Sequence, residues 1–165
     1  MKNNKSDNKK GGKSYIIVVG CGRLGANLAT ALSDVGENVV LIDKSAESFR
    51  KLSPSFGGIT LVGDASEMTV LNNAGIAKAT AVISLTNNDN TNIMVAQLAK
   101  KMFNINQVIA RLYDPERECV YREFGIETIC PAVLSMKEID ILLPSIPLGY
   151  LEQEGGEVNQ KIAEK

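Results

Sequence analysis

Short apolar runs alternate along this chain with segments in which apolar residues recur every three or four positions. Runs of four to six β-branched and other apolar residues predict buried strands, whereas the wider spacing predicts amphipathic helices. Alternation of this kind requires a parallel sheet with right-handed crossovers. The predicted strands are Tyr15–Val19, Asn38–Ile42, Gly58–Val62, Thr80–Leu85, Gln107–Leu112 and Ile126–Ile129.

The predicted helices have recognisable start and stop residues. The first carries one apolar stripe, formed by Leu24, Leu28, Ala31, Leu32 and Val35, and Gly36 ends it. The others run from Ser45 to Leu52, from a Ser66 cap to Asn73, from Asn90 to Met102, from an Asp114 cap and Pro115 to Gly125, and from Ala132 to Leu143. Ile93, Met94, Leu98 and Met102 are predicted to form the apolar side of the Asn90–Met102 helix.

The first strand leads into a G-x-G-x-x-G turn at Gly20, Gly22 and Gly25. In such a turn the first glycine permits a tight reversal, the second lets the backbone approach a pyrophosphate, and the third lets the helix pack against the sheet. The helix N-terminus offers free N–H groups to phosphate. Asp43 ends the second strand, where its carboxylate can bind ribose hydroxyls and would repel a 2′-phosphate, which disfavours NADP.

The order of strand, glycine turn, helix, strand and acid predicts a Rossmann-type nucleotide-binding domain. Its fold class is α/β, a doubly wound parallel sheet of six strands in the order 3-2-1-4-5-6. A ligand then lies outside the carboxyl ends of strands one and four, where the strand order reverses.

Further polar residues follow the other predicted strands. Arg23 is placed to reach a terminal phosphate, and Asp64 either accepts a hydrogen bond from adenine or caps the next helix. Arg111 either reaches phosphate or pairs with acids across a subunit contact. The seven polar residues from Thr86 to Asn92 are expected to supply ribose and phosphate ligands. The predicted site residues are Gly20, Cys21, Gly22, Arg23, Leu24, Gly25, Asp43, Lys44, Asp64, Ala65, Thr86, Asn87, Asn88 and Arg111.

Composition narrows the class of protein. The 165 residues carry a net charge of −1, so bulk electrostatics do not favour nucleic acid or an anionic membrane. No apolar stretch approaches the ~20 residues of a membrane span. The three cysteines lack a C-x-x-C spacing and are expected to be free thiols in a reducing cytoplasm, with Cys21 a small packing residue. We predict one ordered domain, 14–143, between a disordered basic leader, 1–13, and a polar tail, 144–165.

Catalytic groups are sparse in this sequence. It contains no histidine, and no pair of residues has the spacing of a known acid–base, metal-binding or Walker-type motif. This favours a binding protein over an enzyme. The alternatives are a small NAD-dependent oxidoreductase or redox sensor, which would need a substrate domain, and a transcriptional regulator, which would need a DNA-binding unit.

Several quoted segments together resemble one family. V-V-G-C-G-R-L-G, L-I-D, L-V-G-D-A-S, S-L-T-N-N-D-N-T-N, V-I-A-R-L-Y-D-P-E and F-G-I-E-T-I-C-P are similar to the N-terminal domain of TrkA-type proteins. These RCK, or KTN, domains regulate potassium channels and the Trk and Ktr transporters. The similarity covers Tyr15 to Leu143. It implies phosphate binding by Gly20, Gly22, Arg23 and Gly25, ribose binding by Asp43 and adenine binding by Asp64.

The resemblance also implies ligands and partners. Family members bind AMP, ADP, ATP or NAD(H), and their dimers stack into an eight-membered ring that gates an integral membrane potassium transporter. It therefore implies a cytoplasmic regulatory subunit at the inner face of the membrane, with no nucleic-acid partner. Some relatives place a cation-binding glutamate after the proline equivalent to Pro131, and Ala132 in that position argues against a metal-assisted triphosphate site.

Assembly follows from the same resemblance. The chain is too short to contain the second, C-terminal lobe of full-length members, so a second RCK subunit is expected to supply it. We also expect at least a homodimer. Its contacts are predicted on the Asn90–Met102 and Pro115–Phe124 helices, which carry Met94, Met102, Phe103, Val120, Tyr121 and Phe124.

Overall fold

The computed structural model describes residues 12–146 and 148 of the chain. Six parallel strands form one sheet in the order β3-β2-β1-β4-β5-β6, which confirms the predicted doubly wound topology. Each strand begins and ends within one residue of its predicted bounds. The strands are β1 (Tyr15–Val19), β2 (Asn38–Asp43), β3 (Ile59–Val62), β4 (Ala81–Ser84), β5 (Gln107–Arg111) and β6 (Glu127–Ile129).

The helices fall between the strands as the sequence predicts. The α-helices are α1 (Arg23–Asp34), α2 (Met68–Asn73), α3 (Asp89–Gln97), α4 (Glu118–Glu123) and α5 (Pro131–Leu142). The 3₁₀-helices are η1 (Ala46–Lys51), η2 (Ile76–Lys78) and η4 (Pro115–Arg117), and η3 (Leu98–Met102) is a π-helix. Asp114 begins η4 as predicted, because its side chain accepts a hydrogen bond from the Glu116 amide.

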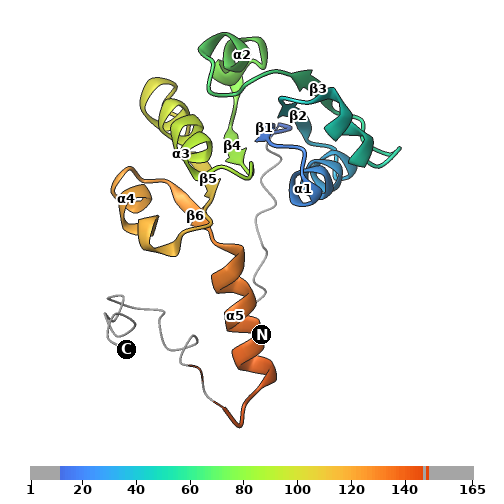
Figure 1. Ribbon diagram of the computed structural model, residues 1–165. Coiled ribbons are helices and arrows are strands. Elements are labelled where there is room, and N and C mark those ends of the chain that lie inside the picture. Colours follow the sequence, from blue (N-terminus) through green and yellow to red (C-terminus); the bar gives the residue numbers. More distant parts are fainter. Residues whose placement is uncertain (1–11, 147, 149–165) are drawn as a thin grey trace, which may run out of the picture.

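Two apolar clusters fill the two sides of the sheet. Ile16 and Val18 of β1 pack with Ala26 and Ala29 of α1 on one side. The intervening residues of β1 pack on the other side with buried residues of α2, α3 and α4, as the two-residue period of a strand requires. Figure 1 shows α1 beside β1 to β3, with α2, α3 and α4 on the opposite face and α5 extending away from the sheet.

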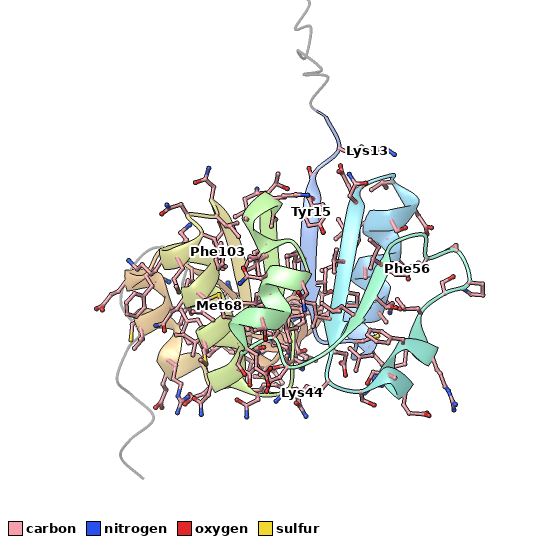
Figure 2. The ribbon with its side chains drawn as sticks, turned by 90° about the horizontal axis from the view of Figure 1, so that it is seen from above. Lys13, Tyr15, Lys44, Phe56, Met68 and Phe103 are labelled. Atoms are coloured by element: carbon pink, nitrogen blue, oxygen red, sulfur yellow. The ribbon has the colours of Figure 1, made fainter. Side chains whose placement is uncertain are left out.

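The parallel sheet places the carboxyl ends of all its strands along one edge. Figure 2 shows Tyr15, which starts β1, and Lys44, which follows β2, at opposite ends of the strands. The glycine turn after β1 and the loops after β2, β3 and β4 therefore meet at the edge marked by Lys44. The fold thus gathers the predicted ligand-binding segments in one place.

One of two predicted helix starts was confirmed and the other was wrong. Ser45 is the N-cap of the helix that follows it, which is the 3₁₀-helix η1. The segment is short and Pro54 follows closely, so it does not meet the cost of nucleating an α-helix. The N-cap of α2 is Glu67 and not Ser66, because the Ser66 hydroxyl donates to Asp64 Oδ1.

The predicted apolar side of α3 is only partly buried. Ile93 and Leu98 pack against the core as predicted. Met94 and Met102 are exposed by 47% and 61%, whereas the residues that face the core are Asn92, Val95, Ala96 and Ala99. These four residues follow one regular helical spacing of three and four positions, and Met94 lies outside that face. Small residues on the inner face let α3 lie close to the sheet.

The predicted ends of the domain are only partly within the described residues. Residues 1–11 of the predicted leader and residues 149–165 of the predicted tail lie outside them. The last predicted helix is present as α5, shifted by one residue at each end. Among the described residues, no helix combines the length and the hydropathy needed to span a lipid bilayer.

Candidate nucleotide-binding site

A cavity of about 280 Å³ opens at the carboxyl edge of the sheet. Its volume lies just below the range for small-molecule sites, about 300–1,000 Å³. It lies at the ends of β1 to β4, and so at the point where the strand order reverses. The residues that line it are Val19, Gly20, Ile42, Asp43, Lys44, Gly63, Ala65, Thr86, Asn87, Asn88 and Thr91.

The three glycines of the turn have different surroundings. Gly20 has a φ of +100°, and a Cβ there would lie 2.9 Å from the Thr86 amide nitrogen. A Cβ on Gly25 would lie 1.9 Å from the Gly20 carbonyl oxygen, so this glycine brings α1 against the strand. A Cβ on Gly22 would meet nothing within 4 Å. Gly20 and Gly25 are therefore required by the fold, whereas Gly22 faces open space.

Gly22 is also the N-cap of α1, and it provides no side-chain hydrogen bond to the helix. The first-turn N–H groups of an α-helix have no acceptor within the helix. Arg23, the first helical residue, is exposed and lies at the same end. The N-terminus of α1 therefore presents amide donors, a helix dipole and one cationic side chain, which together suit a phosphate group.

Asp43 holds the glycine turn in place. Its Oδ2 accepts a hydrogen bond from the Cys21 amide at 2.7 Å, and its Oδ1 accepts one from the Ser45 amide at 2.9 Å. Each carboxylate oxygen can accept more than one hydrogen bond, so the predicted ribose contact remains compatible with this role. Asp43 is thus a structural residue of the turn as well as a lining residue of the cavity.

Asp64 forms an ion pair across the rim of the cavity. Lys44 Nζ lies 2.9 Å from Asp64 Oδ2, and Asp64 Oδ1 accepts hydrogen bonds from the Ser66 amide and hydroxyl. Hydrogen bonds from Ser66 and Lys44 lower the pKa of Asp64 from 3.8 to about 2. The carboxylate therefore closes the turn before α2, and the ion pair links the loops after β2 and β3.

The polar run after β4 has mainly structural roles. Asn88 caps α3 by accepting from the Thr91 amide, and the Asp89 carboxylate accepts from the amides of Tyr113 and Asp114. These roles account for part of the run. Thr86, Asn87, Asn88 and Thr91 line the cavity, so ligand binding by these residues stays a prediction. Asn87, which is exposed, differs from the other three because it makes no hydrogen bond within the described residues.

Asn92 is fully buried and joins the cavity loop to β5. Its Oδ1 accepts from Ser84 Oγ, Thr86 Oγ1 and the Thr86 amide at 2.7–3.0 Å. Its Nδ2 donates to the carbonyl oxygens of Thr86 and Arg111 at 3.1 and 2.9 Å. The amide side chain of Asn92 therefore provides hydrogen-bond partners for buried donors of Ser84 and Thr86 and for buried acceptors of Thr86 and Arg111.

We expect Asn92→Ala to lower the free energy of unfolding by at least about 3 kcal/mol, because it leaves several buried polar groups without partners. Urea denaturation followed by circular dichroism measures the effect. Asn87→Ala is the matched control and should leave stability unchanged. A loss below about 1 kcal/mol in Asn92→Ala would contradict the network's structural role.

The cavity includes only part of the predicted site. Seven predicted residues line it, and seven lie elsewhere: Cys21, Gly22, Arg23, Leu24, Gly25, Asp64 and Arg111. Cys21 is buried with its thiol donating to the Ser48 carbonyl, and burial raises its pKa. Leu24 is 43% exposed. Gly22 and Arg23 flank the cavity at the N-terminus of α1, and Asp64 stands at its rim.

Four lining residues were missed from the sequence: Val19, Ile42, Gly63 and Thr91. Val19 and Ile42 are strand ends, and their predicted role was core packing. Gly63 and Thr91 belong to loops that the sequence did single out. Their place after β3 and within the polar run after β4 was the available signal.

Comparison with known proteins identifies the family. The TrkA-N domain profile matches residues 16–131. The Trk system potassium uptake protein TrkA of Streptomyces coelicolor is 43% identical over 115 residues, covering 70% of this chain and 52% of the relative. A TrkA homolog from Pyrococcus horikoshii is 30% identical over 154 residues, covering 88% and 68%. This chain belongs to the TrkA-N domain family.

A solved structure shares the fold. The Kef C-terminal domain of Shewanella denitrificans, solved in an AMP-bound form, superposes with a TM-score of 0.68 at 20% sequence identity. The similarity covers 79% of this chain and 80% of that one. The present chain spans about half the length of the Streptomyces TrkA protein, so the similarity to that relative describes one domain of a longer protein.

Proposed function

We propose that this chain is a cytoplasmic regulatory subunit that binds an adenine nucleotide or NAD(H) and thereby controls a potassium transporter. One observation carries the proposal: the cavity at the strand-order reversal lies beside a glycine turn whose middle glycine faces open space. The TrkA relatives, which are named as potassium uptake proteins, support the transport role.

The ligand is proposed to lie along the carboxyl edge of the sheet. Its phosphate lies at the N-terminus of α1 near Gly22 and Arg23, and its ribose lies against Asp43. The adenine end lies near Ala65, between the loops after β2 and β3, where Asp64 and Lys44 form the rim. The AMP-bound form of the Kef domain, which has the same fold, supports an adenine nucleotide.

The cavity favours binding over catalysis. Asp43 and Lys44 are its two lining residues with ionisable side chains. Both are engaged, Asp43 with two backbone amides and Lys44 with Asp64. Both side chains therefore hold the loops of the cavity, and its lining residues include no nucleophile paired with a base. The Cys21 thiol is buried and has a raised pKa, which makes it a poor redox sensor because the thiolate is the reactive form.

Assembly is proposed to use α5 as well as the helices expected from the sequence. Leu134, Ile139, Ile141 and Leu142 of α5 are all more than 40% exposed, and Figure 1 shows that this helix extends away from the sheet. Met94, Met102 and Val120 are exposed too, whereas Tyr121 is buried. An apolar helix in this position favours a protein partner, either a second copy or another RCK subunit.

We expect Asn87→Ala to weaken the binding of AMP about fivefold without changing stability, since it removes one hydrogen-bonding side chain from the cavity wall. Isothermal titration calorimetry of the full chain with AMP, ADP, ATP, NAD and NADH measures the effect and ranks the ligands. Asn73→Ala is the matched control, because Asn73 is exposed at the end of α2 and does not line the cavity.

Two outcomes would contradict the proposal. The first is that the wild-type chain binds none of the five nucleotides. The second is sustained oxidation of NADH with a defined small substrate, which would assign the cavity to an oxidoreductase.

A further inference from the structure

The 3₁₀-helix η1 holds one residue of the glycine turn, Cys21, by two of its atoms. The Cys21 thiol donates to the Ser48 carbonyl at 3.1 Å, and Lys51 Nζ donates to the Cys21 carbonyl at 3.4 Å. The Cys21 amide donates to Asp43 Oδ2 at 2.7 Å. Every polar group of Cys21 therefore has a partner, and Lys51 is the one donor to its carbonyl among the described residues.

The Cys21 carbonyl and the Gly22 amide belong to the same peptide group. That group is planar and trans, so its C=O and N–H point in opposite directions. The bond from Lys51 thus orients the Gly22 N–H away from η1. This N–H donates to no acceptor within the described residues, and Gly22 is exposed. Lys51 therefore fixes the direction of a free amide at the N-cap of α1.

Lys51 also brings an uncompensated positive charge to the turn. In the described part of the chain it pairs with no carboxylate, whereas its neighbour Arg50 lies 3.1 Å from Glu47. A cation that donates to a carbonyl polarises the peptide group, which makes the N–H of that group a stronger donor. Orientation and polarisation together favour an anionic oxygen at the Gly22 amide.

We propose that Lys51 is a positioning residue for the phosphate of the bound nucleotide, acting through the Cys21–Gly22 peptide group and not by contact with the ligand. This inference rests on the nucleotide-binding function proposed above and adds a residue outside the cavity on which phosphate affinity depends. A donor that is held in place before binding costs less to order when the ligand arrives. The contribution of Lys51 is confined to ligands that carry a phosphate.

Chemical-shift titration of the ¹⁵N-labelled full chain with AMP and with adenosine tests the inference, because it measures weak as well as tight binding. We expect Lys51→Gln to weaken AMP about fivefold and adenosine less than about twofold. Lys51→Arg keeps a cationic donor and should recover most of the AMP affinity. Arg50→Gln is the matched control, because it removes one positive charge from the same helix at a residue that pairs with Glu47, and it should bind AMP normally.

The ligand-free spectra provide a second measurement. A hydrogen bond to a carbonyl oxygen changes the ¹⁵N chemical shift of the amide in the same peptide group. Lys51→Gln should therefore move the Gly22 resonance, and Arg50→Gln should leave it in place. The midpoint of thermal unfolding without ligand should stay close to that of the wild type in both variants, since exposed side chains contribute little to stability.

Four results would overturn the positioning role. Equal losses of AMP and adenosine affinity in Lys51→Gln would show that Lys51 only supports the fold, and wild-type AMP affinity would exclude any role in binding. An equal loss of AMP affinity in Arg50→Gln would show a general effect of charge. A weaker affinity for AMP with an unmoved Gly22 resonance would assign Lys51 to direct contact with the phosphate. Failure of the wild-type chain to bind AMP would instead refute the proposed function, and the positioning role with it.

Discussion

Gly25→Ala is expected to lower the free energy of unfolding by at least about 3 kcal/mol, a large share of the 5–15 kcal/mol that stabilises a typical domain. The added Cβ would lie 1.9 Å from the Gly20 carbonyl oxygen. That oxygen belongs to the backbone of a turn held by Asp43 through the Cys21 amide, so it cannot move alone. The gain of about 1 kcal/mol in helix propensity from replacing glycine is too small to offset the clash.

Urea denaturation followed by the far-ultraviolet circular dichroism signal measures this loss. Gly22→Ala is the matched control from the same turn, because its Cβ meets nothing within 4 Å. It should stay within about 1 kcal/mol of the wild type. A Gly25→Ala protein as stable as Gly22→Ala would show that α1 does not depend on close approach to the strand.

Gly22→Val is expected to weaken adenine-nucleotide binding by at least about a hundredfold while the domain stays folded. The branched side chain would occupy the open space at the N-terminus of α1, which is the proposed phosphate position. The cost to stability is limited to about 1 kcal/mol, the penalty for an apolar residue at a helix N-cap. A loss of binding without a loss of stability would assign Gly22 to ligand binding. Substitutions at the other two glycines of the turn cannot make this distinction, because the fold itself requires those glycines.

Calorimetry with AMP gives the binding loss, and thermal unfolding without ligand gives the stability. Gly36→Val is the control for a valine at a surface glycine, because its Cβ also meets nothing within 4 Å. Its φ of +89° makes it the more strained of the two, yet AMP should bind it normally. If Gly22→Val bound AMP with wild-type affinity, the phosphate would not lie at this turn.

The sheet and its order were predictable because their causes are local. Apolar runs specify buried strands, and alternation with helices specifies parallel connections. The glycine turn was predictable for the same reason. A Rossmann domain needs a residue without a side chain at Gly20, where the chain turns tightly, and at Gly25, where the helix packs close to the strand. The start of η4 was also recognisable, because Asp114 and Pro115 act within their own segment.

Tertiary contacts decided what the sequence could not show. Asn92 belongs to a polar run that suggested ligand binding, yet its five hydrogen bonds lie within the core. The inner face of α3 was only partly predicted, because Asn92, Ala96 and Ala99 on that face are polar or small and do not stand out in an apolar pattern. The Lys44–Asp64 pair depends on how the ends of β2 and β3 are spaced across the sheet edge.

Asn92 also connects the loop after β4 to β5. Its Oδ1 holds the loop that lines the cavity, and its Nδ2 holds the backbone of Arg111.

Chemical-shift mapping of the ¹⁵N-labelled chain with AMP is the most direct test of the central claim, that an adenine nucleotide binds at the carboxyl edge of the sheet. The account predicts saturable shifts of the amides of Gly20, Gly22, Lys44 and Asn87, with the amide of Gly75, beside Tyr15 at the opposite edge, unaffected. Shifts that cluster away from the glycine turn, or no shifts at saturating AMP, would contradict it.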